Sequence, residues 1–242
     1  MSKPPLHVRG MHGIGDNLHQ RAVIRLLKQT NSVTLESSWH SLYHDLIDGD
    51  FRVVGRGVNL RTQQKNSIRE KHLFAGAPPH HHVIHAIRLS YATGTIAQTA
   101  SNTITETLFN AAGLRGRFPE ADFRLPLKPE WIAEADRIIE GWPTAGKPIM
   151  IYRPLCVRPE WIGSQVRNAN VGQYRDITDM LHDKYFIVSI ADLEPGKEWI
   201  DGPVYPADLT FDRGEFVIEI LASLMHRSDL VFTSGGFAAM LG

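Results

Sequence analysis

The chain has almost no cysteine and no excess of charge of either sign. Its single cysteine, Cys156, excludes an internal disulfide and any zinc site built on pairs of cysteines. Lys and Arg together number 26, and so do Asp and Glu, which gives a formal net charge of zero. This balance argues against a broad electrostatic surface for nucleic acid or anionic lipid, so no stable nucleic-acid partner is expected.

The chain also lacks a long apolar run. No stretch of about 18 consecutive apolar residues occurs, and the first ten residues lack the apolar core of a secretory signal. We therefore expect a cytoplasmic protein without a transmembrane segment, while peripheral contact with a membrane stays open. The hydrophobic content of 43% and the charged content of 21% are typical of a globular protein with one large or two modest domains.

What the first part of the chain does contain is an alternation of short apolar strands and amphipathic helices. The expected strands are 6–9, 32–38, 51–54 and 122–127, and the expected helices are 18–28, 41–47, 83–91, part of 92–112, and 129–140. A chain that begins as strand, helix, strand, helix, strand predicts an α/β fold with a parallel sheet.

The pattern restarts after 141–148, GWPTAGKP, which carries the densest turn signals in the chain. We therefore predict two Rossmann-like α/β domains, 1–142 and 143–242. The second has expected strands 149–152, 185–191 and 229–233, and expected helices 173–184, 215–227 and 237–241. Because a parallel sheet needs cover on both faces, this second domain is expected to be incomplete as given.

A glycine-rich turn joins the first strand to the first helix, in LHVRGMHGIGDNLHQRAVIRLLK. Gly10, Gly13 and Gly15 let the backbone turn tightly and approach a ligand closely. Asp16 stands where the helix should begin, which suits a helix N-cap. The same position suits a catalytic base at the carboxyl end of a strand, where open α/β sheets bind ligands. The turn is neither a P-loop nor a G-x-G-x-x-G dinucleotide motif.

Residues 13–19, GIGDNLH, resemble the G-x-G-D-x-L-h segment near the start of the heptosyltransferase-like glycosyltransferases, the GT-B family of the ADP-heptose:lipopolysaccharide transferases (glycosyltransferase family 9). The resemblance implies two facing Rossmann-like domains, the first for the acceptor and the second for a nucleotide-sugar. It implies metal-independent, inverting transfer from a nucleotide-diphosphate donor to an acceptor hydroxyl in glycan or lipopolysaccharide biosynthesis, without a cofactor.

In that family the aspartate of this turn is thought to deprotonate the acceptor hydroxyl, and it maps onto Asp16. Gly13 and Gly15 would let the acceptor sugar and the donor phosphates approach the backbone. His12 and His19 flank the aspartate. Either could orient the base or contact an acceptor hydroxyl, and a plain polar contact is an equal alternative.

The loop 153–167, RPLCVRPEWIGSQVR, follows the first strand of the second domain. GT-B folds direct basic side chains from this loop toward the donor diphosphate, where negative charge develops as the nucleotide leaves. Arg153, Arg158 and Arg167 can supply that charge, because guanidinium suits bidentate phosphate contacts. Better-known members of the family use threonine and lysine here, and a solvated loop stays the alternative.

A second phosphate-binding segment is Ser234-Gly235-Gly236, after strand 229–233. Free amides at a helix N-terminus bind phosphate well. The segment resembles the family's D-[ST]-G segment, which cradles the donor diphosphate. Thr233 stands where the family has aspartate, and the family's histidine is missing from the residues that follow. The donor therefore stays open.

Other functions stay open beside glycosyl transfer. A nucleotide-sugar epimerase shares the GT-B fold, and a non-catalytic nucleotide-sugar-binding relative would share the phosphate segments. A dehydrogenase is disfavoured, because the glycine spacing is irregular and the second strand ends without a clear ribose-binding acid. The cluster His80–His82 has no carboxylate at ligand spacing, so no metal site is predicted.

Overall fold

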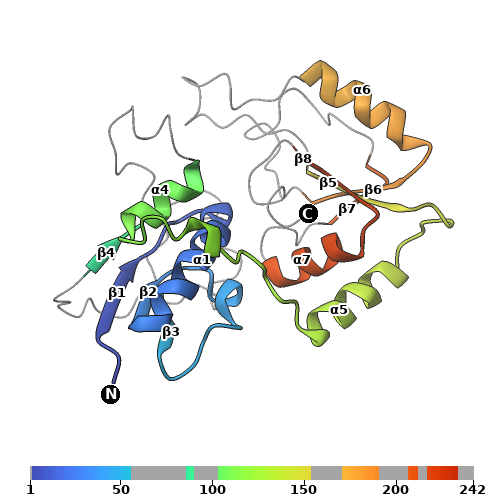
Figure 1. The fold of residues 1–242 in the computed structure, drawn as a ribbon. Helices are drawn as coiled ribbons and strands as arrows, with labels where there is room; N and C mark the ends of the chain where they lie inside the picture. The colour runs from blue at the N-terminus through green and yellow to red at the C-terminus, as the bar shows by residue number, and fades with distance from the viewer. Residues whose placement is uncertain are drawn as a thin grey trace. The chain divides into compact units, whose positions relative to one another are not determined.

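The computed structural model describes residues 2–55, 86–89, 103–153, 171–190, 207–211 and 217–233. The chain divides into two compact units, Met1–Pro126 and Leu127–Gly242, and each has a parallel sheet of its own (Figure 1). The predicted α/β class is confirmed. The sequence predicts the boundary after Trp142, whereas the chain divides after Pro126, before α5 (Pro129–Glu140). This helix belongs to the second unit, where it packs against α7 (Ile218–Arg227).

The first sheet has the order β3-β2-β1-β4, with all neighbours parallel. Its strands are β1 (Pro5–Arg9), β2 (Ser32–Glu36), β3 (Phe51–Val54) and β4 (Ala86–Arg88). The chain moves outward from β1 through β2 to β3 and returns to the other side of β1 with β4. The carboxyl ends of β1 and β4 therefore meet at a topological switch point, the place where open α/β sheets bind ligands.

Helix α1 (Ile14–Thr30) connects β1 to β2 and fills the core of the first unit. Ala22, Val23 and Ile24 are fully buried, as are Val8 on β1 and Leu35 on β2. Burying an aliphatic side chain of this size stabilises the fold by about 1.5–3 kcal/mol. The helix that carries Asp16 near its start is therefore firmly attached to the sheet.

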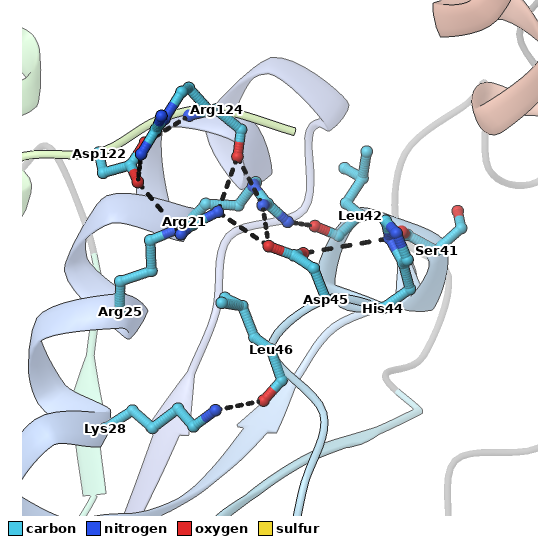
Figure 2. Close-up of polar contacts among 10 residues, drawn as sticks. All are labelled: Arg21, Arg25, Lys28, Ser41, Leu42, His44, Asp45, Leu46, Asp122 and Arg124. Atoms are coloured by element: carbon cyan, nitrogen blue, oxygen red, sulfur yellow. Dashed lines mark hydrogen bonds and ion pairs between the residues drawn. The ribbon is translucent and has the colours of Figure 1, made fainter. Parts of the chain in front are cut away.

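Two arginines on α1 converge on Asp45, as Figure 2 shows. Asp45 Oδ2 lies 2.9 Å from Nη2 of Arg21 and 2.8 Å from Nη2 of Arg25. The Arg21 side chain is fully buried and also donates to the carbonyl of Leu42, in the 3₁₀ helix η1 (His40–Tyr43). These contacts fix α1 to the chain that follows β2.

The same arginines contact the segment 122–127, where the sequence predicts a strand. The described residues there form no strand, and the prediction is wrong. The carbonyl of Arg124 instead accepts hydrogen bonds from Nη2 of Arg21 at 2.7 Å and from Nη2 of Arg25 at 2.9 Å (Figure 2). The Arg124 guanidinium, which hydrogen-bonds Asp122, lowers the pKa of that carboxyl below its ordinary value. Asp122 therefore stays ionised and pairs with Arg25 at 3.1 Å.

Two predicted helices of the first unit also differ from the structure. Within 83–91 the described residues form strand β4, which pairs with β1. The next residue, Leu89, continues this pairing, because its backbone N–H donates to the carbonyl of Arg9 at 3.1 Å. A short apolar run cannot be assigned to strand or helix by periodicity alone. The helix expected over 41–47 is only η1. In contrast, α4 (Ile104–Ala111) lies inside the partly helical segment 92–112 and begins with a capping box of Thr103 and Glu106.

The second sheet has the order β7-β6-β5-β8, again with all neighbours parallel. Its strands are β5 (Ile149–Arg153), β6 (Phe186–Ser189), β7 (Leu209–Thr210) and β8 (Leu230–Thr233), and its helices include α6 (Val171–His182). Three of these strands match the predictions, and β7 was not predicted. Strand β5 lies between β6 and β8, so the second switch point is at the carboxyl ends of β5 and β8.

Helix α5 begins at Pro129, as predicted, and is joined to α7 by an ion pair. Arg227 donates to both carboxylate oxygens of Asp136, through Nε at 2.8 Å and Nη2 at 2.9 Å. In the part of the chain that the structure describes, no helix combines the length and the apolar character needed to cross a membrane.

Candidate functional site

Asp16 lies in the first turn of α1, just beyond the carboxyl end of β1. The helix begins at Ile14, and its N-cap residue is Gly13, with φ −71° and ψ 150°. Asp16 is therefore the third helical residue, and its interpretation as the N-cap is wrong. A carboxylate in the first turn is favoured by the positive end of the helix dipole. The structure thus puts an acid at the switch point of the first sheet.

The glycines of the turn are needed for space. A Cβ on Gly13 would lie 2.6 Å from Asp16 Oδ2, which shows that the carboxylate folds back over the turn. A Cβ on Gly10 would lie 2.6 Å from the backbone oxygen of Glu36 and 2.9 Å from Gln20 Nε2. At Gly10 and Gly13 the missing side chain therefore leaves room for other residues of the chain itself. Gly15 is the second residue of α1.

His19 lies on the same face of α1 as Asp16, one turn further along. Its ring meets the ring of Phe123 edge-on, with centroids 6.3 Å apart. Burial lowers the pKa of His19 below its ordinary value, and the negative charge of Asp16 opposes this effect only in part. The imidazole is therefore mainly neutral at pH 7 and can either donate or accept a hydrogen bond.

The lowered pKa values of His19 and His40 predict a pH dependence of stability. Burial lowers the pKa of both His19 and His40 from 6.5, so below that pH the folded chain binds fewer protons than the unfolded chain. This stability is complete above about pH 6.5 and is lost as the pH falls through the folded values. Urea unfolding at pH 7.5 and 5.5 should give a lower free energy of unfolding at pH 5.5. His19→Gln and His40→Gln should each reduce that loss, and an undiminished loss in both variants contradicts the assignment.

Side chains that the sequence analysis missed hold the backbone of the glycine turn. Asn17 Nδ2 donates to the carbonyls of Met11, at 2.9 Å, and Gly13, at 2.7 Å. Gln20 Oε1 accepts from the Met11 amide at 2.9 Å, and the Trp39 indole Nε1 donates to the His12 carbonyl at 2.8 Å. The signal in the sequence was the position of Asn17 and Gln20 beside Leu18, near the start of a helix that is apolar further along.

Arg153 is the last residue of β5, and it is in register with Thr233, the last residue of β8. Both side chains are half-buried at the switch point of the second sheet. Arg153 is thus at the strand end that the sequence predicts. The other predicted donor residues lie outside the described residues: Arg158, Arg167, Ser234, Gly235 and Gly236.

Within the described ranges, no three side chains of His, Cys, Asp or Glu gather as a metal ion requires. The cluster His80–His82 lies outside these ranges.

No family model matches the sequence, and no curated protein matches it in sequence. Solved structures share its fold. A glycosyl transferase of family 9 from Veillonella parvula superposes with a TM-score of 0.54 at 15% identity, over 95% of this chain and 74% of that chain. The E. coli ADP-heptose lps heptosyltransferase II has a TM-score of 0.54 at 13% identity, over 98% of this chain and 82% of that chain.

A third structure with this fold is the iron-containing dodecameric glycosyltransferase TibC from enterotoxigenic E. coli. It has a TM-score of 0.52 at 9% identity, over 96% of this chain and 53% of that chain. At such identities the likeness concerns the fold. The GT-B fold that the sequence predicts, with two Rossmann-like units, is therefore confirmed.

Proposed function

We propose that this protein is a glycosyltransferase, which moves a sugar from a nucleotide-diphosphate donor to an acceptor hydroxyl. The observation that carries the proposal is Asp16, an acid in the first turn of α1 at the switch point of a parallel sheet. The shared fold supports it, because the three solved structures named above are glycosyltransferases. One of them is an ADP-heptose lps heptosyltransferase, which supports a heptose-like or hexose-like sugar and an acceptor in glycan or lipopolysaccharide biosynthesis.

The proposed reaction is a single displacement at the anomeric carbon. Asp16 accepts the proton of the acceptor hydroxyl while the hydroxyl oxygen forms a bond to that carbon. The bond from the carbon to the donor phosphate oxygen breaks, and the electron pair leaves with the nucleoside diphosphate. Attack from the side opposite the leaving group inverts the anomeric configuration. A positioned carboxylate base contributes about 10²–10⁴-fold to such a step.

The leaving nucleoside diphosphate gains negative charge, which the second unit would stabilise. Arg153 ends β5 at the second switch point, and its guanidinium is suited to phosphate oxygens. Arg158 and Arg167, together with the amides of Ser234, Gly235 and Gly236, complete the proposed donor site. With this positive charge in the protein, the proposed reaction needs no metal ion or cofactor, and we assign it to the cytoplasm.

The space that Gly13 leaves for the Asp16 carboxylate gives a specific prediction. Gly13→Ala should displace the carboxylate, because the new Cβ would lie 2.6 Å from Oδ2. The stability cost should be only about 1 kcal/mol, since the backbone suits alanine and the carboxylate can rotate away. The turnover number should fall about 10–100-fold, because a displaced base no longer meets the acceptor. Steady-state kinetics and thermal unfolding measure both effects.

Gly10→Ala is the contrasting variant. Its Cβ would meet the backbone oxygen of Glu36, which cannot rotate away, so the variant should lose about 1–3 kcal/mol of stability. Wild-type turnover in Gly13→Ala would show that the position of the Asp16 carboxylate does not matter to the reaction.

The alternative with the same fold is a nucleotide-sugar epimerase. Incubating the protein with a nucleotide-diphosphate sugar alone separates the two functions. A transferase leaves the donor largely unchanged until an acceptor is added, whereas an epimerase converts the donor by itself. Conversion of the donor without acceptor would overturn the proposed function in favour of the epimerase, and binding without any turnover would favour a non-catalytic relative.

A further inference from the structure

A closed set of buried hydrogen bonds lies beneath the glycine turn. Asn17, Gln20, Ser37 and Tyr43 are all fully buried. The Oδ1 atom of Asn17 accepts from Gln20 Nε2 at 2.7 Å, from Ser37 Oγ at 2.7 Å and from the Tyr43 hydroxyl at 2.9 Å. Burial raises the pKa of Tyr43, so its hydroxyl stays protonated and donates. Buried polar groups are costly when unpaired, so these side chains fix one another.

This set determines which way the Asn17 amide points. With its oxygen held by three donors, its nitrogen is directed at the carbonyls of Met11 and Gly13. Gln20 is held in the same way, because its Nε2 donates to Asn17 and to the Tyr43 hydroxyl, which leaves Oε1 for the Met11 amide. The turn therefore has a rigid partner for its backbone on the α1 side.

Trp39, in the segment that follows β2, also holds the turn. Its side chain is only 4% exposed, and its indole donates to the carbonyl of His12, in the middle of the turn. The Trp39 amide donates to Ser37 Oγ at 3.1 Å, and Ser37 in turn donates to Asn17. The Ser37 hydroxyl thus links Trp39 to Asn17, and the side chains that hold the turn form one hydrogen-bonded network.

Asp16 depends on this arrangement because α1 begins directly at the end of the turn. The backbone N–H of the next residue, Asn17, donates to the Gly13 carbonyl at 3.0 Å, which is the first hydrogen bond of the helix. Any shift of residues 11–13 therefore moves the helix start and the carboxylate with it. A base displaced by about 1 Å can cost about 10²-fold in rate.

From these contacts we infer that Asn17, Gln20 and Trp39 are positioning residues for the Asp16 carboxylate, acting through the backbone of residues 11–13. The inference rests on the proposed function, since it assigns these side chains a part in the reaction of Asp16. They act on the position of the base and do not contact the substrate. Their loss should therefore lower the turnover number and leave substrate affinity unchanged.

Trp39→Phe tests the inference, because it removes the indole N–H donor to His12 and keeps an aromatic ring in the core. We expect the turnover number to fall about 10–100-fold, with the KM for donor and acceptor within about twofold of wild type. The Tm should fall by about 2–8 °C, because one hydrogen bond is lost and the smaller ring leaves a cavity in the core. A purely structural role would lower Tm and the folded fraction without this separation of kcat from KM.

Trp142→Phe is the matched control, because Trp142 packs against Phe186 in the second unit, with centroids 6.3 Å apart. It should keep the wild-type turnover number. If Trp39→Phe does not fold, Gln20→Met provides the same test, since it keeps the length of the side chain and removes the acceptor for the Met11 amide.

The outcomes separate the inference from the proposed function. Transfer by the wild type together with full turnover in Trp39→Phe, or in Gln20→Met, overturns the positioning role and leaves the function intact. A loss of turnover that only follows the unfolded fraction overturns it as well. Failure of the wild type to transfer sugar, with Asp16→Asn no different, overturns the proposed function and the positioning role with it.

Discussion

Asp16→Asn should lower the turnover number for glycosyl transfer by about 10²–10⁴-fold and leave donor affinity nearly unchanged. The amide has the shape of the carboxylate but cannot take the acceptor proton. Donor affinity should persist, because the proposed donor contacts come from Arg153 and the segments that follow the strands of the second sheet. Steady-state kinetics and calorimetric titration with a nucleotide-diphosphate sugar measure the two quantities.

The matched control is Asp176→Asn, which removes an exposed carboxylate from α6 in the second unit and should keep full turnover. Asp16→Asn should still fold, because losing one acid from a first helical turn costs only about 0.3–1 kcal/mol. Full turnover in a folded Asp16→Asn protein would show that another group, or none, removes the proton.

Arg21→Ala should produce the largest loss of stability, about 3–5 kcal/mol. The guanidinium is fully buried and donates to the carboxylate of Asp45 and to two backbone carbonyls, Leu42 and Arg124 (Figure 2). Its removal leaves a cavity and takes a donor from all three acceptors. Urea unfolding followed by circular dichroism measures the change in free energy.

Lys28→Ala is the control on the same helix. Lys28 is half-buried and its partner Asp48 is exposed, so their ion pair is worth only about 0–1 kcal/mol, and the hydrogen bond from Lys28 to the Leu46 carbonyl adds about 0.5–1.5 kcal/mol. Arg21→Lys should not rescue the fold, since an ammonium cannot reproduce the planar set of donors. Equal stability of Arg21→Ala and Lys28→Ala would contradict the role assigned to the buried arginine.

The strands that the sequence predicts correctly are those with a clear local signal. In β2, Val33 and Leu35 are buried and alternate with half-buried polar residues, and β5 is apolar throughout its buried length. Strand β4 could not be predicted, because three residues with one arginine become a strand only by pairing with β1. The strand predicted at 122–127 is wrong for the converse reason, since the Arg124 carbonyl bonds to arginine side chains of α1, which are distant in sequence.

The candidate site was predictable in its centre and not in its support. Asp16 follows a strand and three glycines, and this local pattern can be recognised in the sequence alone. The N-cap was misplaced by three residues because Gly13, which has no side chain to cap with, takes that position. Trp39 could not be found from the sequence, because it is the folding of β2 beside β1 that brings its indole to the His12 carbonyl.

The most direct test of the central claim measures the release of nucleoside diphosphate by the wild-type protein. A panel of nucleotide-diphosphate sugars is incubated with and without glycan and lipopolysaccharide-core acceptors, and the product's anomeric configuration is read by NMR. We predict release that requires both donor and acceptor, with inversion at the anomeric carbon and almost none in Asp16→Asn. Release that is equally fast without acceptor, or that Asp16→Asn retains in full, would contradict base-catalysed glycosyl transfer at Asp16.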